Sequence, residues 1–293
     1  MDERFIMVGP RSPVLPSAAK KTWYAGKPLF SMALLAVIVL GCWGCELFIP
    51  KNPVYMDLFH ASEAPNGDFW FGSDTMGRDI FSMIWYGGRA SLLIGFLAAA
   101  ISTALAVLFG AISGLAPRRL DELLMRLTEI FLSIPSLLLI VLLQAVLGKA
   151  NGLSLSVVIG VTGWTSMAKV VRSEVRRLRT SEYVTAAKCM GAGFFHILRR
   201  HLAPNFFSSI MFMVVMSVRS AIAAESTLSF MGLGLPLEVV SWGSMLSLAE
   251  KALLTGAWWI ILIPGAFLLV TLLCITSIGN WLRGEGDRRT SNL

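Results

Sequence analysis

The chain has 293 residues, of which 55% are hydrophobic and only 15% are charged, and its mean hydropathy is +0.69. A single soluble core could not bury that much apolar surface, so the composition excludes an ordinary water-soluble domain and predicts a polytopic membrane protein. The net charge of +7 would suit a nucleic-acid-binding protein. Because the basic residues cluster beside long apolar stretches, however, their distribution favours a membrane and no nucleic acid.

Six apolar stretches are long enough to form transmembrane helices, so we expect an all-α fold with six of them. The first, at 29–49, spans about 31 Å as a helix, enough to cross a bilayer. It follows a proline-rich tail at 1–28 and has no small-residue cleavage site, which indicates an uncleaved anchor. A permease-like core at 91–282 would hold the other five helices, and a short tail at 283–293 follows it. These five are predicted at 91–116, 123–147 with Pro135 inside, 153–171, 206–228 and 257–282 with Pro264 inside.

The polar segment at 50–90 predicts a helix that lies flat on the membrane. Apolar side chains from Ile80 to Trp85 fall on one helical stripe, and Ser73 or Asp74 could act as the N-cap. For any single residue of this segment, a capped surface helix without a binding role is the favoured alternative. The motif residues that precede the stripe are Gly72, Asp74, Gly77, Arg78 and Asp79.

Small and ionisable residues within the predicted spans suggest how the helices pack. Gly110 and Gly114 have the spacing that lets a second helix approach closely. Glu129, near the start of the third span, is expected to pair locally with Arg118, Arg119 or Arg126. In the fifth span, Arg219 and Glu225 would be costly in lipid, so they either line a translocation path or pair with another helix. They are six residues apart and point in different directions, so we do not expect them to pair with each other.

The basic segment at 172–205 separates two apolar spans and is predicted to contact a partner in water. A short helix around Thr185-Ala186-Ala187 ends at Gly191-Ala192-Gly193, and helical spacing resumes from 194 to 202 until Pro204. Small residues let a partner approach closely, and glycine permits the sharp turn.

This spacing resembles the cytoplasmic loop of ABC importer permeases. That loop has a pair of small residues, a glycine four residues later, nine further residues and then a short motif that ends in proline. The departures are Thr185, His201 and Ala203. In that family the loop forms a coupling helix that sits in a cleft of the ATPase subunit; an ordinary basic linker is the alternative. The resemblance assigns ATPase coupling to Thr185, Ala186, Ala187, Gly191, Ala192, Gly193 and Pro204.

Two further stretches, at 71–79 and 224–246, resemble the external segments of the dipeptide, oligopeptide and nickel branch of these permeases, in its second subunit type. The resemblance implies a type I importer fold, a second permease subunit, two ABC ATPase subunits and an extracytoplasmic solute-binding protein. The substrate would be a short peptide or, as the alternative, nickel or another metal chelate. In the second stretch the resemblance singles out Gly232, Gly234, Trp242 and Gly243.

The distribution of Lys and Arg predicts the orientation in a bacterial cytoplasmic membrane. With both termini inside the cell, nineteen of the 25 basic residues lie on the cytoplasmic side and five outside, with Arg219 inside a span. This orientation places the segment at 172–205 in the cytoplasm.

No pattern of catalytic or cofactor-binding residues is visible. The sequence lacks GxxxxGK[ST], so we expect ATP and Mg²⁺ to be bound by partner subunits and no cofactor by this chain. Its three histidines form no metal-ligand cluster, and Cys42 and Cys45 lie inside a span, which favours packing thiols. We therefore predict a transport subunit that is not an enzyme. An ATPase-independent channel or secondary transporter would be expected to contain inverted repeats, and none is visible.

Overall fold

The computed structural model describes residues 27–290 apart from residues 50, 149, 194–195, 197–199, 201–202, 237, 249–251 and 253–255. Within this part of the chain the regular structure is helical, with one isolated bridge between Ser73 and Asp79, so the predicted all-α fold is confirmed. Most of the predicted N-terminal tail, and most of the helix expected at 194–202, lie outside the described residues.

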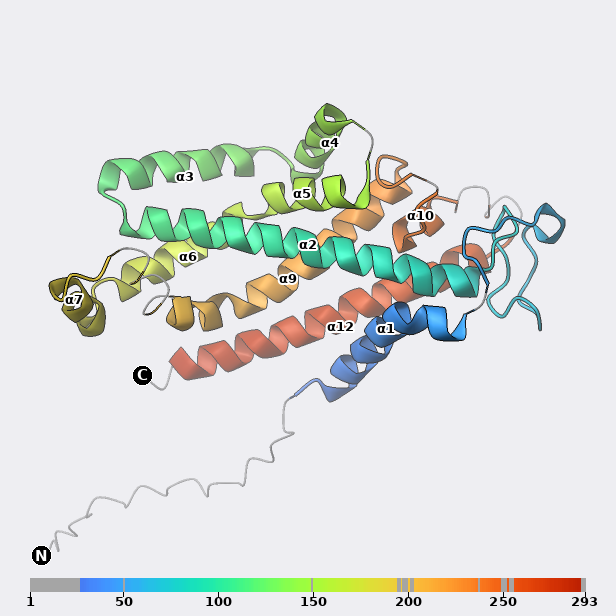
Figure 1. The fold of residues 1–293 in the computed structure, drawn as a ribbon, viewed down its shortest axis with the longest axis horizontal. Coiled ribbons are helices and arrows are strands. Elements are labelled where there is room, and N and C mark those ends of the chain that lie inside the picture. Colours follow the sequence, from blue (N-terminus) through green and yellow to red (C-terminus); the bar gives the residue numbers. More distant parts are fainter. Residues whose placement is uncertain are drawn as a thin grey trace, which may run out of the picture.

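Long helices lie side by side along the molecule (Figure 1). Among the described residues, four helices are long and apolar enough to cross a membrane, and two bent helix pairs raise the number of spans to six if each pair is one span. The four are α1 (Leu29–Phe48), α2 (Ile80–Leu115), α9 (Ala203–Phe230) and α12 (Trp259–Thr290). The bent pairs are α3 (Arg118–Ser133) with α4 (Ser136–Leu147), and α5 (Gly152–Gly163) with α6 (Thr165–Leu178).

The predicted flat helix before the second span is wrong, because these residues form the first turns of α2. The N-cap is Asp79, whose carboxylate accepts the N–H of Ser82 at 3.1 Å, and not Ser73 or Asp74. The helix continues unbroken through Gly87 and Gly88, where the missing side chains leave room for Val240 and Trp242. The boundary that we predicted between a loop at 50–90 and a core from 91 therefore falls inside one helix of 36 residues.

The third and fourth predicted spans are broken more sharply than the sequence suggested. α3 and α4 meet at 94°, where a kink at Pro135 was expected. Ile134 has an extended backbone (φ −98°, ψ 130°), as steric conflict with the following proline ring requires. α5 and α6 meet at 48° around Trp164.

The centre of the bundle is α2, which packs against most of the other helices. A Cβ added to Gly110 would lie 2.6 Å from the carbonyl oxygen of Ala168, and one added to Gly114 would lie 2.7 Å from Val175. The close approach that we predicted from this glycine spacing is therefore confirmed, with α6 as the partner.

The first helix is attached to α2 by one arginine. Arg89 Nη1 lies 2.7 Å from Glu46 Oε1, and its other nitrogens donate to the carbonyls of Cys42 and Trp43. Cys42 and Cys45 are free and buried, as expected for packing thiols.

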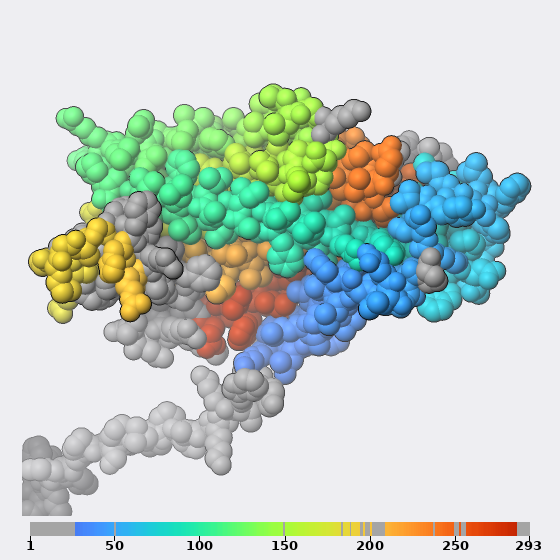
Figure 2. Space-filling model, in the orientation of Figure 1, coloured from blue at the N-terminus to red at the C-terminus, as the bar shows by residue number. Residues whose placement is uncertain are grey.

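The two ends of the bundle carry different structures. The short helix α7 (Glu182–Cys189) and the last turns of α12 lie at one end, hereafter the α7 end (Figure 1). The loop at 51–79, with the 3₁₀ helix η1 (Leu58–His60), and α10 (Trp242–Leu246) lie at the other, the α10 end. In the space-filling view, α7 and the 51–79 loop occupy opposite extremities of the molecule (Figure 2).

Candidate coupling surface and translocation path

The predicted coupling segment forms a helix with one face packed and one face open. α7 follows α6 after a short turn, in which Ser181 N–H donates to the carbonyl of Leu178 at 3.0 Å. Val184 and Ala187 are buried, and Val184 belongs to an apolar cluster with residues of α2 and α6, whereas Thr185 and Ala186 are exposed. Of the small pair expected at a docking surface, Ala186 is therefore exposed and Ala187 is buried.

Gly191 ends this helix in the left-handed conformation, with φ +81°. The N–H of Ala192 donates back to the carbonyl of Ala187 at 3.1 Å, the long hydrogen bond of a Schellman cap. None of the described residues lies within 4 Å of a Cβ added to Gly191 or Gly193. Met190 beside it is 82% exposed.

The structure brings six of the seven predicted coupling residues together around this turn. Thr185 Oγ1 donates to the carbonyl of Ser181 at 3.1 Å and does not reach away from its own helix. Pro204 instead belongs to the next helix as the second residue of α9, a position in the first turn where proline is tolerated.

A carboxylate that we did not predict from the sequence ties the α7 end together. Asp121, in the first turn of α3, is buried and accepts hydrogen bonds from Arg172 and Arg176 of α6. The distances are 2.6 Å from Arg172 Nη2 and 2.8 Å from Arg176 Nη2, and Ser113 Oγ of α2 adds a third donor residue at 2.5 Å. The arginines are four residues apart on one helix face, but nothing in the sequence indicates their partner.

Glu129 pairs locally with Arg126 at 3.0 Å on the exposed surface of α3, which confirms the predicted local contact. Asp121 and Glu129 of α3 therefore differ in kind, because Asp121 connects three helices and Glu129 connects only neighbouring turns.

Glu225, at the α10 end, is completely buried in a shell of hydroxyl groups. Its Oε1 accepts from Ser241 Oγ at 2.8 Å and from Ser229 Oγ at 2.9 Å. Its Oε2 accepts from Ser91 Oγ at 3.0 Å and from Ser226 Oγ at 3.3 Å. Ser91 belongs to α2, Ser226 and Ser229 belong to α9, and Ser241 is the N-cap residue of α10. This one carboxylate therefore joins three helices.

Trp242 fixes α10 in the same place. Its side chain is fully buried, its backbone N–H donates to Ser91 Oγ at 3.2 Å and its Nε1–H donates to the carbonyl of Ile84 at 3.0 Å. A Cβ added to Gly243 would lie 2.6 Å from the Cα of Ser226, so glycine is needed for α10 to approach α9.

The other two glycines of this motif make the turn after α9. Gly232 has φ +74°, which explains the preference for glycine there. Gly234 passes so close to Ser229 that an added Cβ would lie 2.5 Å from the backbone nitrogen of that residue. Both glycines therefore serve a tight turn.

Arg219 and Glu225 do not pair with each other, as expected from their spacing. Within the described residues Arg219 makes no ion pair, and its Nε is buried without a hydrogen-bond partner. A role for either residue in the translocation path stays a prediction.

The motif at 72–79 folds into a closed turn around a buried ion pair. Arg78 Nε lies 2.7 Å from Asp74 Oδ2, and Asp74 Oδ1 accepts the backbone N–H of Arg78 at 2.9 Å. Gly77 has φ +73°, and a Cβ there would collide with the carbonyl of Asp57. This geometry makes the motif a structural element of the loop.

The loop is attached to the last long helix at Gly72 and Ser73. Gly72 has φ +76°, and its Cβ would lie 2.7 Å from the ring of Trp259. Trp259 Nε1–H donates to the carbonyl of Ser73 at 3.1 Å. The loop at the α10 end is therefore fixed against α12.

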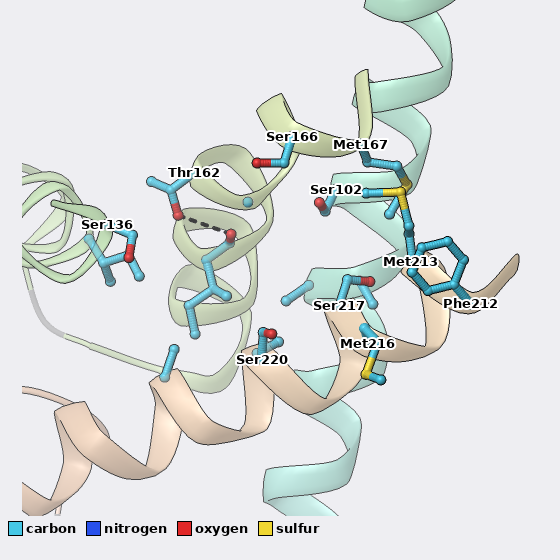
Figure 3. A pocket seen from close by; sticks show the side chains of 17 residues that line it. Ser102, Ser136, Thr162, Ser166, Met167, Phe212, Met213, Met216, Ser217 and Ser220 are labelled. Carbon is cyan, nitrogen blue, oxygen red and sulfur yellow. Dashed lines mark hydrogen bonds between the residues drawn. The ribbon is translucent and has the colours of Figure 1, made fainter. Parts of the chain in front are cut away.

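A cavity of about 370 Å³ lies between α2, α4, α5, α6 and α9 (Figure 3). It lies where both bent helix pairs break, with Ser136 from the start of α4 and Thr162 and Ser166 on either side of the α5–α6 bend. Neither Arg219 nor Glu225 is among the described residues that line it. The sequence offered no sign of this cavity, because its position depends on the two bends.

Comparison with known proteins gives the family context of this geometry. Residues 106–290 match the model of the family described as "binding-protein-dependent transport system inner membrane component". The dipeptide transport system permease protein DppC of Bacillus subtilis is 36% identical over 92% of this chain and 82% of its own length. The oligopeptide transport system permease protein OppC of the same organism is 36% identical over 88% of this chain and 84% of its own. OppC of Haemophilus influenzae is 34% identical over 92% and 87%.

Proposed function

Because the chain belongs to the family of binding-protein-dependent transport system inner membrane components, we propose that it is the permease subunit through which an ATP-driven importer carries short peptides. The peptide substrate is supported by the names of its relatives, which are dipeptide and oligopeptide permeases. These names do not favour nickel or another metal chelate, the alternative that the sequence left open. The observation that carries the coupling role is the outward-facing α7 and its glycine turn.

The α7 end faces the cytoplasm in this proposal, and so do both chain termini. Support comes from the charge distribution, because nineteen of 25 basic residues then lie inside the cell. Membrane insertion of the spans is in keeping with the family's description as an inner membrane component.

Three kinds of partner complete the transporter. A second permease subunit closes the translocation path, a solute-binding protein delivers peptide to the α10 end, and two ATPase subunits bind ATP and Mg²⁺ and receive α7 in their clefts. Movement of α7 reaches the bundle through Val184, which belongs to an apolar cluster with residues of α6 and α2. Closure of the ATPase pair then drives alternating access by a rigid-body shift of packed helices.

The proposal is tested by Gly191→Trp in the reconstituted complex. A bulky residue at a position that strongly prefers glycine should keep α7 from its cleft, so substrate-stimulated ATP hydrolysis and peptide uptake should fall to background. Gly148→Trp is the matched control, because Gly148 also has positive φ (+84°) and no described residue within 4 Å of an added Cβ, but lies in the α4–α5 turn. Equal stimulation in both variants would contradict coupling through α7.

Co-purification provides an independent check of the partners. The chain should elute with an ATPase subunit after solubilisation, and this association should survive Gly148→Trp. Peptide transport by this chain alone in liposomes would overturn the proposal in favour of an ATPase-independent channel or secondary transporter.

A further inference from the structure

The cavity in Figure 3 has the position of a ligand site inside a membrane protein. Helices can break within a membrane only where the interrupted backbone is buried in protein or lines a cavity. Transporters commonly place substrate sites at such breaks. Here two breaks, at 94° and at 48°, meet at one cavity.

The lining is mainly apolar but includes six hydroxyl groups, and none of its described residues is charged. A hydroxyl group both donates and accepts a hydrogen bond, so these side chains suit the neutral amide groups of a ligand, which also do both. No lysine, arginine, aspartate or glutamate is present to neutralise a charged group. The hydroxyl side chains are those of Ser102, Ser136, Thr162, Ser166, Ser217 and Ser220.

Ser102 is the side chain that most favours a ligand site here. Its residue is only 3% exposed, and its Oγ has no hydrogen-bond partner among the described residues. It lies beside the α5–α6 break, since a Cβ added to Gly163 would be 3.4 Å from Ser102 Oγ. Buried hydroxyl groups almost always have a partner, so this unpaired one beside the cavity would gain a hydrogen bond from a ligand once a small side-chain rotation turns it into the cavity. By contrast, Thr162 and Ser217 already donate to carbonyls of their own helices.

We propose that this cavity is a transit site that binds the backbone amide groups of the transported peptide and does not read its side chains. The inference rests on the proposed function. An amide offers one donor and one acceptor, which hydroxyl groups can satisfy without any charge. The cavity is also lined by three methionines, Met167 of α6 and Met213 and Met216 of α9. Their flexible thioether side chains can adapt to peptide side chains of different shape. The cavity volume falls within the ~300–1,000 Å³ of small-molecule sites.

The test compares uptake of three dipeptides that share a backbone, Ala-Ala, Ala-Lys and Ala-Glu, by the full transporter with its binding protein in proteoliposomes. In Ser102→Ala, uptake of all three should fall by the same factor, roughly fivefold, which corresponds to one lost hydrogen bond. Ser220→Ala, an exposed hydroxyl on the wall formed by α9, should give a uniform but smaller loss and keeps the test decisive if Ser102→Ala assembles poorly. Ser133→Ala is the control, because its hydroxyl donates to the carbonyl of Ile130 outside the cavity.

Two results would overturn the transit site. One is a loss confined to the acidic or to the basic dipeptide, which would mean that side-chain charge is read here. The other is normal uptake by both serine variants while the wild-type complex imports peptide. In that second case the proposed function stands, whereas loss of stimulated ATP hydrolysis or of all import in the wild-type complex would count against the proposed function itself.

Discussion

Two buried carboxylates hold the opposite ends of this bundle together in different ways. Glu225, at the α10 end, is surrounded by four serine hydroxyls. Asp121, at the α7 end, accepts from two arginines and one serine. Each carboxylate joins three helices, but only Asp121 has cations as partners among the described residues.

The difference indicates a rigid end and an adaptable one. Serine side chains are short, so the shell around Glu225 requires α2, α9 and α10 to keep their spacing. Arginine side chains are long and those of Arg172 and Arg176 are partly exposed, at 24% and 39%, so they can follow a moving helix.

Replacing Glu225 should have the largest effect, and it tests whether the serine shell holds the α10 end together. Glu225→Leu should lower the free energy of unfolding by about 3 kcal/mol, because four buried hydroxyls lose their common acceptor. Thermal unfolding of the purified complex measures the loss. Thr227→Ala on the same helix is the control, since this exposed hydroxyl donates only to its own helix. An unchanged unfolding temperature in Glu225→Leu would show that the serine shell does not hold the α10 end.

Gly77→Ala tests the rigidity of the same end at the loop. The added Cβ would lie 1.7 Å from the carbonyl oxygen of Asp57, and the backbone has positive φ, so we expect a loss of about 2 kcal/mol. Gly232→Ala is the matched control, because it has the same positive φ but open space and should cost about 1 kcal/mol. Thermal unfolding again provides the measurement, and equal losses would mean that backbone conformation alone matters.

The sequence predicted the features that depend on neighbouring residues. The glycine turn after α7, the packing role of Gly110 and Gly114 and the Glu129–Arg126 pair all follow from spacing within one segment. The shell around Glu225 does not, because Ser91 is 134 residues away in the chain. The 94° bend was underestimated, since Pro135 predicts a break but not its angle, and the cavity depends on that bend. The flat helix was predicted wrongly because an apolar stripe at the start of a long buried helix looks like an interfacial one.

Asp121→Asn tests the α7 end, because its effect on the free energy of unfolding should depend on salt concentration. Losing the charge should cost about 1.5 kcal/mol in unfolding at low salt, less than for Glu225→Leu, because the two arginines keep partial access to solvent. At 1 M salt the difference between wild type and Asp121→Asn should shrink, since screening weakens ion pairs that reach solvent. The Glu225→Leu difference should not shrink, because neutral hydroxyls surround that carboxylate.

Glu129→Gln is the control for Asp121→Asn. Glu129 lies on the same helix as Asp121 but has an exposed partner, so the substitution should change the unfolding free energy by less than about 0.5 kcal/mol at any salt. If the Asp121→Asn difference is instead insensitive to salt, the ion pairs at the α7 end are as enclosed as the serine shell, and the two ends do not differ in adaptability.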